Sequence, residues 1–164
     1  MITLIAAIGK NNEIGLNNHL LWDLKEDLKF FKKVTQHHKV VMGLNTYLSI
    51  GKALPNRENI VLSDKDIELQ GVKVYNNITD MINKEMNTEE EVFVIGGSSL
   101  YNYFYPLADR MYLTLIDDTK EADTYFPKID YSKWTTTVLG ENIENNIKYT
   151  WVLFERSHNE ESST

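Results

Sequence analysis

Short apolar runs recur along the chain, and amphipathic segments lie between several of them. Runs of this length are typical of strands, whereas apolar side chains spaced three and four residues apart indicate helices. The expected strands cover residues 2 to 8, 39 to 43, 58 to 63, 72 to 75, 91 to 95, 109 to 116, 134 to 139 and 149 to 155. The expected helices cover residues 24 to 34, 45 to 50, 78 to 84 and 98 to 105.

A helix follows the first, second, fourth and fifth of these strands. Parallel neighbours need a crossover connection, so this order predicts a mainly parallel sheet. The last two strands have no helix between them and predict an antiparallel C-terminal edge. We therefore expect a single-domain α/β fold, with a twisted eight-stranded sheet and about four flanking helices, over residues 1 to 156. Residues 157 to 164 are expected to form a flexible acidic tail.

Composition excludes several classes of protein. Seventeen Lys and Arg against twenty-four Asp and Glu give a net charge of −7, which disfavours nucleic acid as a partner. The chain has no cysteine, so it can form neither disulfides nor thiolate metal sites, and it suits the cytoplasm. The apolar run at residues 2 to 8 is too short to span a membrane. A monomer is the default expectation.

Metal catalysis and serine hydrolysis are also disfavoured. The four histidines, His19, His37, His38 and His158, show no ligand spacing such as H-E-x-x-H, so no metal is expected. The sequence contains no G-x-S-x-G elbow either.

Asp27 is the leading catalytic candidate. It lies three residues after Leu24 and four before Phe31, within a helical stripe that Leu28 and Val34 continue and that we expect to be buried. A carboxylate stripped of water has a raised pKa and often takes part in proton transfer. An aspartate at a helix start can also simply interact with the helix dipole, with its head group at the rim.

Two glycine-containing turns are candidate phosphate sites. Gly96 and Gly97 separate a buried strand from a helix that we expect Ser98 to cap, and Gly43 precedes a second helix that Asn45 or Thr46 can cap. Glycines permit close approach of a ligand, and helix amides can bind phosphate. The pattern is neither the G-x-G-x-x-G fingerprint nor a Walker A loop, and plain turns and caps explain it equally well.

Several strings together resemble dihydrofolate reductase, from Ile2 to about Glu155. Their order and spacing carry the resemblance. The matching pieces are Ile14-Gly15, Trp22, Asp27, Phe31-Lys32, Met42-Gly43, Thr46, Ser49-Ile50-Gly51, Leu54-Pro55-Asn56-Arg57, Ile95-Gly96-Gly97, Tyr101, Tyr112-Leu113-Thr114 and Asp123-Thr124-Tyr125-Phe126-Pro127.

The resemblance implies NADPH-dependent reduction of 7,8-dihydrofolate to tetrahydrofolate for one-carbon metabolism, with hydride transfer to pterin C6 and protonation of N5. Asp27, supported by Thr114, would bind the pterin 2-amino group and N3, and water passing Leu20 and Trp22 would carry the proton. Arg57 would bind the glutamate tail, with Lys32 nearby. The expected pocket walls, which antifolate inhibitors would also contact, are Ile5, Ala6, Leu28, Phe31, Ile50, Leu54 and Ile95.

The resemblance also implies an NADPH groove, with residues 9 to 23 forming a mobile loop over the nicotinamide. Its expected lining is Ala7, Ile14, Gly15, Asn18, Gly43, Asn45, Thr46, Ser63, Gly96, Gly97, Ser98, Ser99, Leu100 and Tyr101. The chain departs from the family pattern at Leu21, where proline is common, and at Leu44, Ser99 and Asn76, which replace residues that are often basic. We therefore expect weakened discrimination between NADPH and NADH, although Thr46, Ser63 and Lys65 remain as partners for the 2′-phosphate.

Two other functions remain as alternatives. A pteridine- or flavin-related reductase on the same scaffold is the nearer one, and Asp27, Phe31 and Arg57 in register favour folate over it. A non-catalytic nucleotide-binding module is the other, and a retained acid on an apolar face argues against it, because such burial is costly.

Overall fold

The computed structural model describes residues 1–157, and the expected acidic tail lies outside the described residues except for Ser157. The main sheet has eight strands in the order β10-β11-β8-β1-β7-β4-β5-β6. Its strands are β1 (Ile2–Ile8), β4 (Lys39–Gly43), β5 (Glu58–Leu62), β6 (Val72–Tyr75), β7 (Val92–Val94), β8 (Arg110–Ile116), β10 (Trp134–Glu144) and β11 (Ile147–Arg156). The helices are α1 (Lys25–Thr35), α2 (Leu44–Ile50), α3 (Ile78–Met81) and α4 (Ser98–Phe104).

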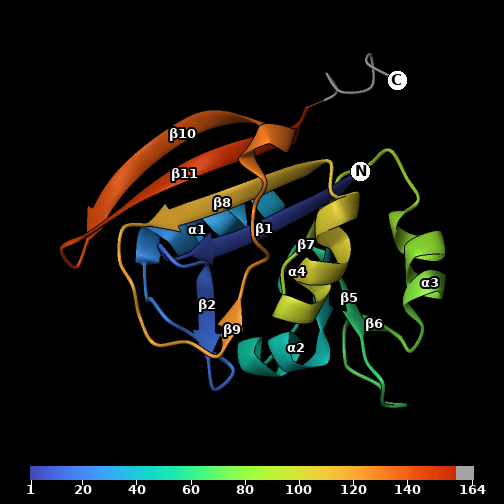
Figure 1. Ribbon diagram of the computed structural model, residues 1–164. Helices are drawn as coiled ribbons and strands as arrows, with labels where there is room; N and C mark the ends of the chain where they lie inside the picture. The colour runs from blue at the N-terminus through green and yellow to red at the C-terminus, as the bar shows by residue number, and fades with distance from the viewer. Residues whose placement is uncertain (158–164) are drawn as a thin grey trace.

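The expected fold class is confirmed. Strands β8, β1, β7, β4, β5 and β6 pair in parallel, and β11 pairs antiparallel with both β8 and β10. The hairpin of β10 and β11 therefore forms the antiparallel edge (Figure 1). Strand β10 extends five residues beyond the expected 134 to 139, because backbone pairing with β11 continues where the apolar pattern ends. Within residues 1–157 no helix is long and apolar enough to cross a membrane.

The core lies on both faces of the sheet, which explains the continuous apolar run of β4. Val41 joins the cluster under α3 and α4, whereas Val40 and Met42 join the cluster beneath α1 and α2. All three side chains are fully buried. A strand covered on both faces needs apolar residues at every position, as in parallel sheets generally. The carboxyl end of β4 is thereby fixed beside that of β7.

Residues 9 to 23 were expected to form a loop, and part of this segment is instead folded into a second, small sheet. Its strands are β3 (His19–Leu20), β2 (Glu13–Leu16) and β9 (Thr124–Tyr125), in that order. These strands are only two to four residues long, so the sequence carries little periodicity that would indicate them. Whether the segment moves over a ligand stays a prediction.

Helix α1 begins without a side-chain cap of its own, since Leu24 occupies the cap position. The Glu144 carboxylate of β10 replaces it, accepting hydrogen bonds from the backbone N–H groups of Lys25 (2.7 Å) and Glu26 (3.1 Å). A carboxylate at this end satisfies amides that lack helical partners and interacts favourably with the helix dipole. The C-terminal hairpin thus fixes the start of the helix that carries Asp27.

The expectation that Leu28 is buried is wrong, because 53% of this residue is exposed. Leu24 is buried, and Phe31 and Val34 pack partly against the core. The face of α1 turned to the sheet also contains Phe30, whose ring stacks on Trp151 at 5.0 Å. Leu28 lies at the border of this face, where the helix overhangs an open cavity rather than the core.

Candidate active site

Asp27 is the third residue of α1, and its side chain points inward to the sheet. The Thr114 hydroxyl of β8 donates to Asp27 Oδ1 at 2.6 Å, and the Trp151 indole Nε1 of β11 donates to the same oxygen at 2.9 Å. The interpretation in which Asp27 only interacts with the helix dipole, with its head group at the rim, is therefore wrong. Two strands hold this carboxylate beneath the helix.

The pKa of Asp27 is raised, and burial is the main cause. The hydrogen bonds from Thr114 and Trp151 lower the pKa and offset part of this rise, while the negative charge of Glu144 adds to it. A carboxyl group in such surroundings binds a proton at higher pH than an exposed aspartate does. It also prefers a ligand that brings positive charge or paired N–H donors.

Four of the expected pocket walls lie in one apolar cluster. Phe31 of α1, Leu54 and Ile95 pack around Ile5, which is 5% exposed. Ile95 directly precedes the Gly96–Gly97 turn, so the cluster connects the helix of Asp27 to that turn. Ala6 and Ala7 pack against two other clusters of the same sheet.

Two expected wall residues, Ile50 and Leu28, and Leu20, which was expected on the path of the proton-carrying water, are apolar and open to solvent. Leu20 is 74% and Ile50 is 37% exposed. Leu20 and Leu28 line a cavity of about 490 Å³, together with Trp22, Leu24, Lys120 and Ile147 among others. Exposed apolar side chains gathered at a cavity are typical of a ligand site.

Arg57 lies beside the C-terminal half of α1. Its Nη1 donates to the Thr35 hydroxyl at 3.1 Å, its Nε donates to the Pro55 carbonyl at 2.9 Å, and its guanidinium lies 5.9 Å from the centre of the Phe31 ring. Burial lowers the pKa of Arg57, which still leaves it a cation at neutral pH. Two of its five N–H donors are used in this way, so others remain for a carboxylate. Lys32 is exposed on α1 and adds positive charge.

Asn59 fixes the turn that carries Arg57, and the sequence analysis missed it. This side chain is 3% exposed; it accepts a hydrogen bond from Leu54 N at 2.8 Å and donates to the carbonyls of Leu54 (2.9 Å) and Arg57 (3.0 Å). An asparagine near the start of a strand carries no spacing signal for such a role. Its hydrogen bonds fix the backbone positions of Leu54 and Arg57 relative to the candidate site.

Replacing Asn59 with alanine should lower the free energy of unfolding by about 2 kcal/mol, because buried backbone groups lose their partners. The Michaelis constant for the substrate should rise as well, since Leu54 and Arg57 lose their support. Urea unfolding and steady-state kinetics measure both effects. Asn83→Ala, at an exposed position of the same residue type, is the control, and equal stability of the two variants would contradict the prediction.

The two glycine turns meet at the carboxyl ends of β4 and β7. The Gly43 amide donates to the Gly96 carbonyl at 2.9 Å. Gly96 is buried with φ of 129°, a conformation that favours glycine, and a Cβ added there would lie 3.4 Å from the Thr46 hydroxyl oxygen. A Cβ added at Gly97 would lie 3.6 Å from the same oxygen. Two backbone turns and the Thr46 hydroxyl therefore converge here.

The expected helix caps are wrong. Gly43 and Gly97 occupy the cap positions of α2 and α4, and neither helix start has a side-chain cap hydrogen bond. Glycine is accepted at this position because it places no side chain against the helix amides. The side chains of Asn45, Thr46 and Ser98 are therefore not committed to capping. Tyr101 is committed elsewhere, since its hydroxyl donates to the Ile5 carbonyl at 2.7 Å.

The small sheet is tied to the segment before β9 by Asp123. Its backbone N–H donates to the Gly15 carbonyl at 2.9 Å, and its carboxylate accepts from the Asn17 amide at 3.0 Å. A Cβ at Gly15 would lie 2.7 Å from the Thr124 hydroxyl oxygen, so glycine is needed for this approach. Ile14 packs against the core, whereas Asn18 is exposed at the tip between β2 and β3.

Comparison with known proteins identifies the family to which the chain belongs. The family model described as dihydrofolate reductase matches residues 1–156. The chain belongs to the dihydrofolate reductase family.

Individual members show the same likeness over nearly full length. The chain is 41% identical to the dihydrofolate reductase of Bacillus subtilis (strain 168), over 96% of each protein. It is 33% identical to that of Staphylococcus haemolyticus, over 94% of this chain and 95% of the relative. A solved structure of the dihydrofolate reductase from Enterococcus faecalis, complexed with NADP(H) and RAB-propyl, matches with a TM-score of 0.85 and 33% identity, over 96% of both chains.

As a dihydrofolate reductase, the chain is an oxidoreductase that reduces dihydrofolate with NADPH. This confirms the expected family, reaction and cofactor. Within the described residues no group of three or more histidine or acidic side chains is placed to hold a metal ion.

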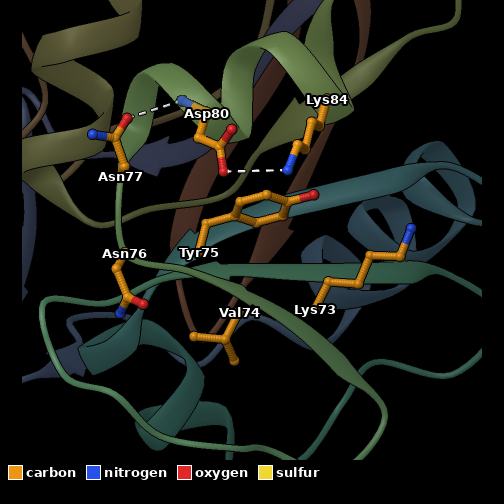
Figure 2. Close-up of a pocket in the computed structure, with 7 residues that line it drawn as sticks. All are labelled: Lys73, Val74, Tyr75, Asn76, Asn77, Asp80 and Lys84. Carbon is orange, nitrogen blue, oxygen red and sulfur yellow. Dashed lines mark hydrogen bonds and ion pairs between the residues drawn. The ribbon is translucent and has the colours of Figure 1, made fainter.

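Members of the dihydrofolate reductase family often have basic residues where this chain has Leu44 and Asn76. Leu44 packs partly into the apolar cluster around Val40. Asn76 donates to the carbonyls of Ser63 (3.0 Å) and Lys65 (2.9 Å) and lines a polar cavity of about 510 Å³ between β6 and α3. Figure 2 shows this cavity, whose lining includes none of the predicted site residues. Ser63 is 4% exposed, and its hydroxyl oxygen accepts from the Lys65 amide at 3.0 Å.

Further residues that the sequence analysis missed anchor Trp22. The Trp22 indole donates to Asp118 at 3.0 Å, and the Lys120 ammonium donates to the Leu21 carbonyl at 2.8 Å. Glu13, only 1% exposed, accepts from the backbone amides of Asn11 (2.8 Å) and Lys120 (3.1 Å). Apart from the bond between Asn11 and Glu13, these contacts join segments more than ninety residues apart, so periodicity could not indicate them.

Proposed function

We propose that Asp27 is the acid that binds the pterin ring of 7,8-dihydrofolate and that reduction takes place between it and the Gly96–Gly97 turn. The observation that carries the proposal is the inward carboxylate of Asp27, held by Thr114 at 2.6 Å and with its pKa raised by burial. The apolar cluster of Ile5, Phe31 and Ile95 supports one continuous site, because it reaches from α1 to the glycine turn.

The substrate fits these residues by its chemistry. The Asp27 carboxylate has acceptor sites left for the pterin 2-amino group and N3, both of which are N–H donors. The guanidinium of Arg57 suits the glutamate α-carboxylate, and Lys32 adds positive potential near it. The walls in this proposal are Ile5, Ala6, Leu28, Phe31, Ile50, Leu54 and Ile95, with antifolate inhibitors as further ligands of the same pocket.

The glycine turn fits a dinucleotide cofactor. A Cβ at Gly96 or Gly97 would approach the Thr46 hydroxyl, so the bare backbone leaves room there for a bound group. The N–H groups of a helix start can bind a phosphate, and the side chains of Thr46, Ser63 and Ser98 add hydroxyl donors. Bound NADPH would supply the hydride that pterin C6 accepts. The cofactor residues in this proposal are Ala7, Ile14, Gly15, Asn18, Gly43, Asn45, Thr46, Ser63, Gly96, Gly97, Ser98, Ser99, Leu100 and Tyr101.

The protein's part in the proton transfer rests on Asp27, Leu20 and Trp22. Asp27 gives electrostatic support to a cationic pterin, and water admitted past the exposed Leu20 protonates N5. Trp22 keeps its ring in place through the hydrogen bond to Asp118 and thereby limits the access of bulk water. Thr114 acts through Asp27, which it orients.

The test mixes purified protein with dihydrofolate and NADPH and follows the near-ultraviolet absorbance of the cofactor. Absorbance should fall only when both reactants are present. A flavin-pathway substrate offered in place of dihydrofolate should give no turnover. Turnover of that substrate without turnover of dihydrofolate would contradict the proposal.

Discrimination between NADPH and NADH should be weak in this chain, because Leu44 offers the 2′-phosphate no charge. Leu44→Arg should raise kcat/KM for NADPH about tenfold, the effect of one added charge-assisted hydrogen bond, and leave NADH nearly unchanged. Comparing kcat/KM for the two cofactors at equal salt measures this. A clear NADH preference in the parent chain, or equal gains with both cofactors, would contradict it.

A cytoplasmic monomer with no nucleic-acid partner completes the proposal. Its supports are the cysteine-free composition, which suits a reducing compartment, and the net charge of −7. Light scattering should give a mass near the 19.0 kDa of one chain.

A further inference from the structure

Two donors converge on one oxygen of Asp27, and only Thr114 of these was expected to support it. Trp151 Nε1 lies 2.9 Å from Oδ1, and the Thr114 hydroxyl lies 2.6 Å from the same atom. A carboxylate has about four acceptor sites, two on each oxygen. Across residues 1–157, Asp27 Oδ2 accepts no hydrogen bond from the protein. These two donors therefore determine that Oδ2 is the oxygen left to accept hydrogen bonds from a ligand.

The indole of Trp151 is fixed by its strand and by its neighbours. Trp151 of β11 is the direct cross-strand partner of Thr114 of β8, so both side chains leave the same face of the sheet. The indole ring stacks on Phe30 of α1 at 5.0 Å and meets the Tyr149 ring edge-on at 5.4 Å. On the neighbouring strand, a Cβ at Gly140 would lie 3.5 Å from the indole, so a small residue there leaves room for the ring. Because the indole ring is packed on several sides, its orientation is fixed and its N–H points in one direction.

We propose that Trp151 is a positioning residue: its indole N–H and the Thr114 hydroxyl hold the Asp27 carboxylate in one orientation and leave Oδ2 to the pterin. Neither residue needs to touch the pterin for this role. The proposal rests on the proposed function for the identity of the ligand, whereas the indole–carboxylate bond itself is independent of any activity.

The same bond stabilises the charged form of Asp27. It lowers the pKa of Asp27, as the bond from Thr114 does, against the larger effect of burial. Of the charged groups around Asp27, Glu144 of β10 is the one that raises this pKa by its charge. A hydrogen bond from Tyr149 keeps the pKa of Glu144 below its usual range, and burial keeps the Tyr149 phenol neutral by raising its pKa. Asp27 is thus the carboxyl group of this cluster whose pKa is raised, whereas the pKa of Glu144 is lowered.

Nuclear magnetic resonance of the indole N–H groups tests the bond without turnover. The chain has three tryptophans, and Trp151→Phe identifies the Trp151 signal by its loss. In the parent chain this signal should titrate together with Asp27, and the titration should vanish in Asp27→Asn. The Trp134 indole, which donates to the Tyr105 hydroxyl at 3.2 Å, serves as the reference that Asp27→Asn leaves unchanged. A Trp151 signal that is indifferent to Asp27→Asn would overturn the proposal.

Kinetics of Trp151→Phe tests the consequence, since phenylalanine keeps an aromatic ring against Phe30 and removes only the donor. KM for dihydrofolate should rise about tenfold, the effect of one charge-assisted hydrogen bond, while KM for NADPH stays the same. The pH midpoint of kcat/KM should move upward, because the charged form of Asp27 loses a donor. Trp134→Phe removes an indole donor far from Asp27 and should change neither quantity.

The outcomes separate the two claims. Equal changes in both Michaelis constants, or an unmoved pH midpoint, would reduce Trp151 to a packing residue and overturn the proposal. A coupled titration of Trp151 and Asp27 in a chain that fails to reduce dihydrofolate would instead refute the proposed function, with the orientation of Asp27 by Trp151 still supported.

Discussion

Asp27→Asn should lower kcat near neutral pH by about 10²–10⁴-fold, the range found when an acid or base group is lost from a reaction. The amide has nearly the same shape as the carboxyl group, so the pocket keeps its form. It lacks the negative charge that favours a protonated pterin, and the amide nitrogen that replaces one carboxylate oxygen cannot accept a hydrogen bond. Part of the activity should return as the pH falls, because protonated dihydrofolate then arrives from solution. A pH series of steady-state rates measures both effects.

Stability provides the control for this variant. The pKa of Asp27 is raised in the folded chain, so the folded state binds this proton more tightly than the unfolded state does. Stability from this group is therefore fully present below the unfolded pKa and falls as the pH rises towards the folded pKa. At neutral pH the charge is a cost that asparagine removes, and urea unfolding should show the variant to be at least as stable as the parent. Neutral-pH turnover equal to the parent's would remove Asp27 from the mechanism.

Arg57→Gln should raise KM for dihydrofolate by about 10–100-fold, because a charge-assisted and bidentate contact to the glutamate carboxylate is lost. The effect on kcat should be small, since this contact is far from the reacting atoms and acts equally in the ground and transition states. Glutamine can still donate a hydrogen bond but supplies no charge. Steady-state kinetics with dihydrofolate as the varied substrate gives both constants.

A substrate without the glutamate tail separates binding from misfolding in this case. A dihydropterin that lacks the tail should be reduced equally by Arg57→Gln and by the parent chain. Lys52→Gln, which removes an exposed cation from the same stretch of chain, should leave both substrates unaffected. If Arg57→Gln impaired the two substrates to the same extent, Arg57 would act on the fold rather than on the tail.

Much of the sheet was predictable because its strands are buried on both faces. Val40, Val41 and Met42 show why, since each is fully buried and the run therefore contains no polar residue. The far end of β10 could not be predicted in this way. Ile143 lies there with 67% of the residue exposed, and backbone pairing with β11 rather than burial makes this part of the strand. The small sheet around β2 was not predicted because its strands, two to four residues long, carry little periodicity.

The candidate site was predictable where the residues of one helix or one short sequence motif indicate it by their spacing. Asp27 is such a case, because its helical spacing from Leu24 and Phe31 turns it inward. Leu28 shows the limit, since periodicity does not distinguish a core from an open cavity. Trp151 and Glu144 lie more than a hundred residues from the atoms of α1 that they contact, and only the folded sheet brings them there.

A crystal structure of the chain with dihydrofolate or a stable analogue and an oxidised cofactor tests the central claim most directly. We predict that both donors of the pterin, its 2-amino group and N3, lie within hydrogen-bonding distance of the Asp27 carboxylate, with the nicotinamide ring on the side of Gly96 and Gly97. A pterin bound elsewhere, or bound with its ring turned so that Asp27 meets no N–H donor, would contradict the account.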